Sequence, residues 1–218
     1  MGSDFLMEKF YRFPPQHLSY EMKQLLSLIP EAARSQVKQL LQSTQVVIKI
    51  TKKRKTKHGD FRRQLNGVSL ITINTTPNPY RFLITLLHEL AHYDVVQAYG
   101  TYQIKPHGAE WKAAFRKTLL PFLNSHIFPE PICGLLALHM KNPRASTDRD
   151  FKLVMALRKY DLPSLQIPVF KLQEGQRFML DDGRIFVKSK KRRTRFECNE
   201  IASGKTYLFS PHAEVTLI

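Results

Sequence analysis

Cysteine is scarce in this chain of 218 residues, which contains only Cys133 and Cys198 and no C-x-x-C pair. A disulfide framework is therefore excluded as the source of stability, and a reducing cytoplasm is the expected location. Long hydrophobic runs are also lacking. The longest apolar stretches, around residues 82–87 and 132–138, are too short to span a bilayer, so no membrane association is expected. The N-terminal residues contain no continuous apolar run of the kind found in signal peptides.

Acidic residues are few: Asp and Glu number 18 against 34 Lys and Arg, which gives a formal net charge of +16 at pH 7. Clustered positive charge suits a polyanion, because each neutralised phosphate releases condensed counterions. Solvated loop charge is the simpler alternative. We expect DNA to be a partner, and the candidate contacts lie in two clusters: Lys52, Lys53, Arg54, Lys55 and Lys57, and Lys190, Lys191, Arg192, Arg193 and Arg195.

Hydrophobic residues make up 43% of the chain, which is enough for a packed core. The apolar spacing predicts two helices within residues 19–43, and the β-branched run at residues 45–50 predicts a strand. Residues 61–65 and 68–73 flank Asn66-Gly67, a pair that is typical of a hairpin turn. An α+β fold with a small three-stranded sheet is therefore expected.

The helix that follows has a clear signal at each end. Asn78 can cap its first turn, Pro79 suits the first helical position, and Gly100 can end it. Because apolar side chains occupy nearly every side of this segment, the helix is expected to be buried. Further helices are predicted at residues 109–120, near 131–140 and near 149–160.

The composition changes after Asp161. Pro163 and Pro168 mark a linker, and short alternating runs follow, separated by turn signals that contain glycine. We therefore expect one domain at residues 17–160 and a small basic β-rich module at residues 165–218. The strands of the second module are predicted at 176–180, 184–188, 194–198 and 205–209, with turns at Asp182-Gly183 and Ser203-Gly204.

The strongest motif is His-Glu-Leu-Ala-His at residues 88–92. Positions i and i+4 share one face of a helix, so His88 and His92 can bind one metal ion. A catalytic zinc keeps one coordination position open for water, and Glu89 can take a proton from that water and pass it to a leaving amine. The alternative is a pair of hydrogen-bonded core histidines. A metal is favoured, because two histidines and a glutamate in a buried helix are costly without a partner.

A third ligand must come from another part of the chain. His107 lies in Pro106-His107-Gly108, where a short loop from Gly100 could return the chain over the metal. The competing candidate is Glu110, although its simpler role is to favour the start of a helix through the helix dipole. We favour His107, and separate substitutions followed by a zinc measurement would decide between the two.

Three stretches resemble the SprT-like family, which includes the Spartan-type proteases: HGDFRRQLNGVSLITIN, TLLHELAHY and PHGAEWKAAF. The resemblance covers the run from Lys57 to Phe115 well and the rest of the chain loosely. It implies a zincin-like metallopeptidase domain in which His88, His92 and His107 bind zinc and Glu89 is the catalytic acid/base. Because Spartan-type proteases degrade proteins trapped on DNA, it also implies a protein substrate, DNA as a partner and a role in the repair of DNA–protein crosslinks.

The C-terminal module departs from this family's pattern. Many SprT-like proteins carry a zinc ribbon built on four cysteines, whereas Cys198 is the only cysteine in this tail, so a degenerate ribbon without metal is expected. Two other functions stay open. The chain could be a basic nucleic-acid-binding protein with a structural or vestigial zinc site, or a metal-dependent hydrolase that acts on something other than peptides. Imidazole ligands also suit divalent metals other than zinc.

Overall fold

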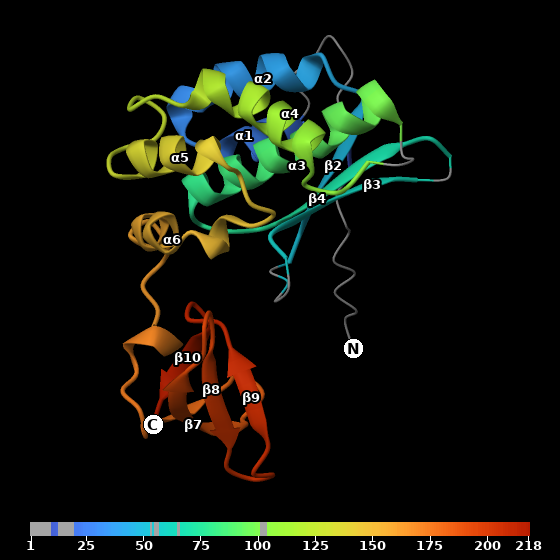
Figure 1. Cartoon of the computed structure of the whole chain (residues 1–218). Coiled ribbons are helices and arrows are strands. Elements are labelled where there is room, and N and C mark those ends of the chain that lie inside the picture. Colours follow the sequence, from blue (N-terminus) through green and yellow to red (C-terminus); the bar gives the residue numbers. More distant parts are fainter. Residues whose placement is uncertain (1–9, 13–19, 53, 55–56, 65, 101–103) are drawn as a thin grey trace, which may run out of the picture. The chain divides into compact units, whose positions relative to one another are not determined.

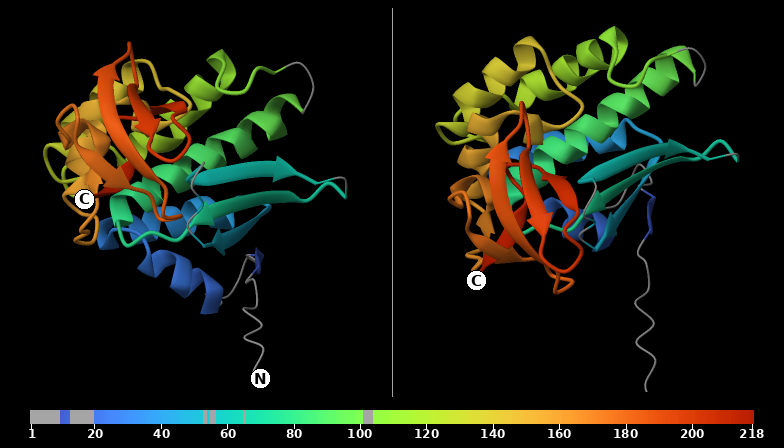
Figure 2. Two further views of the ribbon diagram at one scale, coloured as in Figure 1. Left: turned by 90° about the horizontal axis from the view of Figure 1, so that it is seen from below. Right: turned by 60° about the horizontal axis from the view of Figure 1, so that its bottom comes forward.

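The structure is a computed structural model, and it describes residues 10–12, 20–52, 54, 57–64, 66–100 and 104–218. The chain divides into two compact units, Met1–Asp161 and Leu162–Ile218. Figures 1 and 2 show the ribbon of both units. Of the residues expected to contact nucleic acid, Lys53 and Lys55 lie outside the described residues.

The first unit contains a four-stranded sheet in the order β1-β2-β4-β3. The prediction of three strands was therefore one strand short. The three predicted strands are present as β2 (Val46–Thr51), β3 (Gly59–Arg63) and β4 (Ser69–Asn74). The additional strand, β1 (Phe10–Arg12), pairs antiparallel with β2. It has only 3 residues, which is too short for an alternating pattern to be recognised in the sequence.

The strand order places β3 at one edge of this sheet. β2 and β4 pair in parallel, and β3 pairs antiparallel with β4. The predicted hairpin turn at Asn66-Gly67 is confirmed: Gly67 has a φ of 79°, and its N–H donates to the Gln64 carbonyl at 2.9 Å. Glycine adopts this left-handed backbone at little cost, since it has no Cβ.

The long helix α3 (Pro79–Tyr99) carries residues 88–92 into the centre of the first unit. Both of its ends are as predicted. The Asn78 side chain accepts the Arg81 N–H at 3.0 Å, Pro79 is the first helical residue, and Gly100 ends the helix with a φ of 79°. α3 packs on β3 and β4 and also on α4 (Ala109–Leu119), so it runs between the sheet and that helix (Figures 1 and 2).

The other helices complete one hydrophobic core around α3. Large apolar side chains such as Leu25, Phe82 and Phe115 are fully buried there, and each contributes about 1.5–3 kcal/mol through burial. The remaining elements are α1 (Tyr20–Ser27), η1 (Glu31–Ala33), α2 (Arg34–Gln42), η2 (Leu120–Phe122), α5 (Ile132–Lys141), η3 (Thr147–Arg149) and α6 (Phe151–Arg158).

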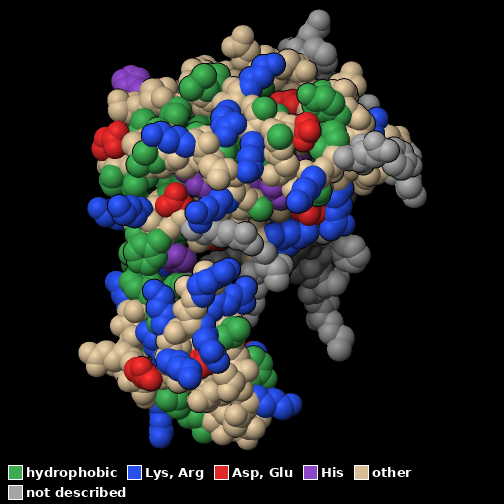
Figure 3. Space-filling view, in the orientation of Figure 1, with side chains coloured by type: hydrophobic (Ala, Val, Ile, Leu, Met, Phe, Trp, Pro, Cys, Tyr) green, Lys and Arg blue, Asp and Glu red, His purple; other side chains and the backbone are tan. Residues whose placement is uncertain are grey.

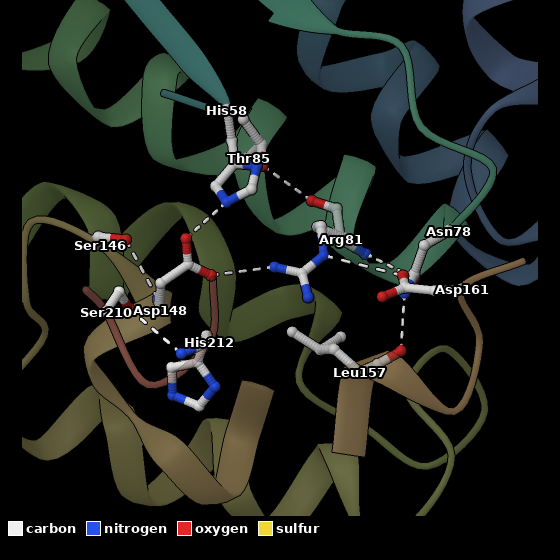
Figure 4. Close-up of polar contacts among 10 residues, drawn as sticks. All are labelled: His58, Asn78, Arg81, Thr85, Ser146, Asp148, Leu157, Asp161, Ser210 and His212. Atoms are coloured by element: carbon white, nitrogen blue, oxygen red, sulfur yellow. Dashed lines mark hydrogen bonds and ion pairs between the residues drawn. The ribbon is translucent and has the colours of Figure 1, made fainter. Parts of the chain in front are cut away.

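A polar network at the start of α3 joins segments that are far apart in the sequence (Figure 4). Asn78 Nδ2 donates to Asp161 Oδ1 at 2.7 Å, and Arg81 Nη1 donates to Asp148 Oδ1 at 3.1 Å. His58 Nε2 lies 2.7 Å from Asp148 Oδ2. Burial would raise the pKa of Asp148, but His58 and Arg81 outweigh it and lower that pKa to about 2. The network therefore fixes the segment that leads into β3 against the start of α3.

The second unit contains a six-stranded sheet in the order β5-β10-β6-β7-β8-β9. Four strands lie where the sequence predicted them, whereas β5 and β10 were not predicted. Val169, Phe178, Phe186, Cys198 and Val215 are fully buried in its small core. The strands are β5 (Ile167–Pro168), β6 (Arg177–Met179), β7 (Ile185–Lys191), β8 (Phe196–Glu200), β9 (Thr206–Phe209) and β10 (Glu214–Leu217).

Both cysteines lie within the described part of the chain. Cys133 and Cys198 are both free thiols, but Cys198 alone is buried, while Cys133 is half-buried. Within the described part of the chain, no helix combines the length and the apolar character that crossing a membrane requires.

Candidate metal centre

Three imidazoles from two stretches of chain meet beside α3. His88 and His92 lie one turn apart on that helix, and His107 lies in the loop that leads into α4. His107 Nε2 is 3.1 Å from His92 Nε2 and 3.2 Å from His88 Nε2. Among the described residues, these three form the one group of His, Cys, Asp or Glu side chains placed to hold a metal ion. Glu110, the competing candidate, lies in the first turn of α4 and is not part of it.

The distances from His107 Nε2 to the Nε2 atoms of His88 and His92 fit a tetrahedral zinc ion. Zn–N bonds of about 2.0–2.1 Å at tetrahedral angles place neighbouring nitrogens about 3.3 Å apart, close to the observed separations. Hydrogen bonds among the imidazoles explain this geometry less well. A ring nitrogen offers either one proton or one lone pair, so His107 Nε2 cannot satisfy both of its neighbours. A shared cation satisfies all three nitrogens.

Burial keeps the imidazoles of His88 and His92 neutral. It lowers the pKa of His88 well below its usual value, and the neighbouring His92 and His107 lower that pKa further. Burial, followed by the charge of His107, also lowers the pKa of His92 to about 4. A neutral imidazole has a free lone pair, so His88 and His92 can bind a metal at neutral pH without first losing a proton.

The backbone at His107 has an unusual conformation. Its φ is 60°, in the left-handed region that residues other than glycine adopt at a cost of about 1–2 kcal/mol. The next residue, Gly108, precedes α4 and donates its N–H to the Lys105 carbonyl at 2.8 Å. This tight turn directs the His107 imidazole toward α3. Strain of this kind persists where the surrounding structure enforces it, often at functional sites.

Trp111 packs against all three histidines. Its ring centroid lies 4.6 Å from that of His88, 5.4 Å from that of His92 and 4.7 Å from that of His107. Its side chain is buried, and its Nε1–H donates to the His88 carbonyl at 3.4 Å. Trp111 was not among the site residues predicted from the sequence. The signal in the sequence was its position four residues after His107, near the start of the helix predicted at residues 109–120.

Glu89 follows His88 on α3 and is buried, with only 5% of its surface exposed. Burial, reinforced by the charge of Asp60, raises its pKa to about 8, although Arg54, Lys57 and the Phe61 backbone N–H act in the opposite direction. Glu89 of the metal-free protein therefore carries a proton at neutral pH. The carboxyl group is covered by the first residues of β3, the edge strand.

Gly59 at the start of β3 is required by the approach of Glu89. A Cβ at this position would lie 2.5 Å from Glu89 Oε1 and 2.8 Å from Thr85 Cγ2. Gly59→Ala is therefore expected to displace either the carboxyl group or the strand and to lower the free energy of unfolding by about 1–3 kcal/mol, measured by urea denaturation.

Gly134→Ala is the matched control for this prediction. Gly134 lies within α5, and the nearest atom to an added Cβ is the Glu130 side chain at 3.2 Å. Alanine is favoured over glycine inside a helix by about 0.5–1 kcal/mol, so this variant should be at least as stable as the wild type. Equal stability of the two variants would show that Gly59 is not constrained.

The structure separates the basic residues of the first cluster by their environment. The guanidinium of Arg54 donates to Asn74 Oδ1 at 2.7 Å and to Thr72 Oγ1 at 3.0 Å. Lys57 Nζ lies 2.9 Å from Asp60 Oδ1. Both side chains are thus engaged within the first unit, whereas Lys52 is exposed at the end of β2.

The basic residues of the second cluster come together at one place. Lys190 and Lys191 end β7, and Arg192, Arg193 and Arg195 lie in the turn before β8, with all five exposed. Arg192 Nε lies 2.5 Å from Glu197 Oε1, and Arg195 Nη1 donates to the Leu208 carbonyl at 3.4 Å. These contacts hold part of a positively charged hairpin tip in place.

Comparison with known protein families gave one match, and it lies within the first unit. Residues 26–124 match the model of the SprT-like family, so the resemblance seen in the sequence is confirmed. The matched region contains α3, the loop with His107 and α4, and therefore the whole three-histidine group. Comparisons with curated proteins and with solved structures gave no match.

Proposed function

We propose, from the match of residues 26–124 to the SprT-like family model, that the chain is a zinc-dependent endopeptidase that cleaves DNA-associated proteins. The observation that carries the proposal is the convergence of three Nε2 atoms next to a buried glutamate. This combination of ligands and base is that of a zincin-like hydrolytic site, in which three protein ligands leave one metal position open.

The residues have separate roles in this proposal. His88, His92 and His107 hold the metal through their Nε2 atoms. When bound, zinc supplies a Lewis acid that polarises a carbonyl group and makes water more acidic. Glu89 takes a proton from the attacking water and passes it to the amine of the leaving peptide. Trp111 packs against the three imidazoles and maintains their orientation.

The raised pKa of Glu89 suits proton transfer. A general base works best when its pKa is close to the working pH, and a value of about 8 places Glu89 near neutrality in the metal-free site. A nearby dication stabilises the carboxylate and lowers this pKa, so Glu89 becomes the ionised base once metal is bound.

An extended substrate has a place to bind at the outer edge of β3. An edge strand offers unpaired backbone groups to which a peptide can add as a further strand. Gly59 contacts the Glu89 side chain, and the Phe61 ring lies 6.5 Å from that of His92, centroid to centroid. A peptide on this edge would therefore run beside the catalytic group.

The positive charge supports DNA as the partner that brings substrate to the enzyme. The exposed hairpin tip at residues 190–195 concentrates Lys and Arg in the second unit, and the net charge of the whole chain is +16. Phosphate contacts of this kind are independent of sequence and weaken steeply with salt. Binding to DNA would concentrate the peptidase near proteins trapped there, which is the basis for the proposed role in crosslink repair.

Metal analysis of the purified full chain, combined with a cleavage assay on a DNA-binding protein, tests the proposal. We expect stoichiometric zinc, cleavage that chelation abolishes and zinc restores, and faster cleavage with single- or double-stranded DNA. Bound zinc with no cleavage under any of these conditions, together with steeply salt-dependent DNA binding, would instead favour the second candidate. In that case the chain is a basic nucleic-acid-binding protein with a structural metal, a function that the charged hairpin tip supports.

A further inference from the structure

A second site of the first unit lies away from the histidines, at the end of α5 and the start of α6. There the surface forms a hollow of about 430 Å³. Small-molecule sites have volumes of about 300–1,000 Å³, so the hollow is large enough for one ligand group of nucleotide size. Three cationic side chains line it: Lys141, Arg144 and Lys152. All three are exposed, and Lys and Arg also gather over α4 and α5 on the face shown in Figure 3.

The single carboxylate that lines the hollow is engaged in the fold itself. Asp150 Oδ1 accepts the Leu153 N–H at 3.2 Å as the cap of α6, and Asp150 Oδ2 lies 3.3 Å from His139 Nδ1. Among the described residues, neither Lys141 nor Lys152 forms an ion pair with a carboxylate. The hollow therefore carries a net positive charge and suits an anion.

The walls of the hollow are fixed by contacts with α4. Arg116 donates from Nε to the Met140 carbonyl at 2.7 Å and from Nη2 to the Lys141 carbonyl at 2.9 Å. Lys112 Nζ donates to Asn142 Oδ1 at 2.8 Å. These bonds hold the end of α5, so little ordering is needed when a ligand binds.

An apolar surface lies next to the three cations. Phe151 and Leu138 both line the hollow, and they are 49% and 58% exposed. An exposed aromatic ring beside cationic side chains is the combination that binds single-stranded nucleic acid, because the cations contact phosphate while a base stacks on the ring. The bases of a duplex are stacked within the helix and cannot reach such a ring.

We propose that this hollow binds one nucleotide of a single-stranded nucleic acid, with its phosphate held by Lys141, Arg144 and Lys152 and its base stacked on Phe151. The site deepens the DNA association in the proposed function, but it does not depend on peptidase activity. It is distinct from both basic clusters expected from the sequence. α4 supports the hollow through Lys112 and Arg116 and also carries Trp111, so the strand would lie on the same unit as the metal centre.

The charge contribution is tested by fluorescence anisotropy of a labelled oligothymidylate bound to the full chain. The double variant Lys141→Glu/Lys152→Glu is compared with Lys23→Glu/Lys159→Glu, which changes the charge equally at exposed positions of the same unit outside the hollow. Loss of the contact with this one phosphate should lower the slope of log affinity against log salt by about 0.7 more than in the control. Equal affinities and slopes for the two variants would overturn the proposal.

The stacking contribution is tested by Phe151→Ala, with Tyr99→Ala as the control, since Tyr99 is an exposed aromatic residue on α3. Phe151→Ala should weaken binding of the single strand by about ten-fold or more, with little change for a duplex. An equal loss of affinity in Phe151→Ala and Tyr99→Ala contradicts base stacking. An equal loss of affinity for the single strand and the duplex also contradicts it. If adenosine monophosphate competes as well as the strand at the same phosphate concentration, the hollow is a site for a free nucleotide and the proposal fails. Because no cleavage is measured, these results are independent of the peptidase test.

Discussion

Glu89→Gln is expected to abolish peptide cleavage while zinc stays bound. Glutamine has nearly the same size as glutamate and can fill the same buried position next to Gly59, but its amide cannot accept a proton from water. Since general base catalysis contributes about 10²–10⁴-fold, the rate should fall at least that far. The measurement is cleavage of a protein substrate, with metal content determined on the same sample.

Glu110→Gln is the matched control for this result. It makes the same chemical change in the first turn of α4, close to the site but outside the three-histidine group. This variant should keep most of the activity. Undiminished cleavage by Glu89→Gln would refute the role assigned to Glu89, whatever the metal content.

Glu89→Gln is also expected to change the stability of the fold, and the sign of this change follows from the pKa of Glu89. In the metal-free fold this pKa is about 8, above the value of 4.5 expected in the unfolded chain. The contribution of the protonated Glu89 carboxyl to the free energy of unfolding is therefore fully present below pH 4.5 and is lost as the pH rises toward 8. At 1.36 kcal/mol per pKa unit, the free energy of unfolding of the wild type should fall by on the order of 3–5 kcal/mol relative to that of Glu89→Gln over this pH range.

Thermal unfolding of the chelated proteins measures this effect. The two proteins should melt at similar temperatures near pH 4.5, whereas Glu89→Gln should be the more stable near pH 9. The histidines are present in both proteins, so their titration cancels in the difference. A difference in melting temperature that does not change with pH would show that Glu89 is ionised in the fold throughout this range.

Loss of bound zinc is the second large effect, and it is expected for His107→Asn. Asparagine tolerates the left-handed backbone better than most residues, so the substitution removes the imidazole with the least strain at φ 60°. Two protein ligands then remain for the metal. Affinity should fall by more than the roughly 10–100-fold loss seen when a group behind a ligand is removed.

Competition with a coloured chelator measures this affinity, and Glu110→Gln again serves as the control. Glu110→Gln should bind zinc like the wild type, because Glu110 does not belong to the group of converging donors. The opposite pattern, with zinc lost in Glu110→Gln and retained in His107→Asn, would overturn the assignment of the third ligand.

Sequence alone predicted the features that depend on local spacing. The pair His88 and His92 follows from helical periodicity, and Asn78 and Gly100 mark the ends of α3, since capping depends on neighbouring residues. Local spacing could not predict the position of His107, because it lies 15 residues after His92 and only the folded chain brings the two rings together. The motif and the family resemblance made His107 the better candidate but could not supply that geometry.

Features that depend on contacts between residues far apart in the sequence could not be predicted. The parallel pairing of β2 with β4 cannot be deduced from the alternation within either strand. Gly59 gave no local signal, since the Glu89 side chain that it must avoid comes from a helix 30 residues further on. Arg54 was expected to contact nucleic acid because it lies among lysines, whereas its guanidinium is bound by Thr72 and Asn74. A sequence does not show which cationic side chains form hydrogen bonds or ion pairs within the fold.

The position of Trp111 gives this protein an optical reporter. It is the only tryptophan in the chain, and its indole touches every imidazole of the group. Light absorbed at the red edge of the protein spectrum therefore excites a fluorophore located at the metal site itself. Its emission will change when those imidazoles gain a proton or a cation, so occupancy can be followed in the unlabelled protein.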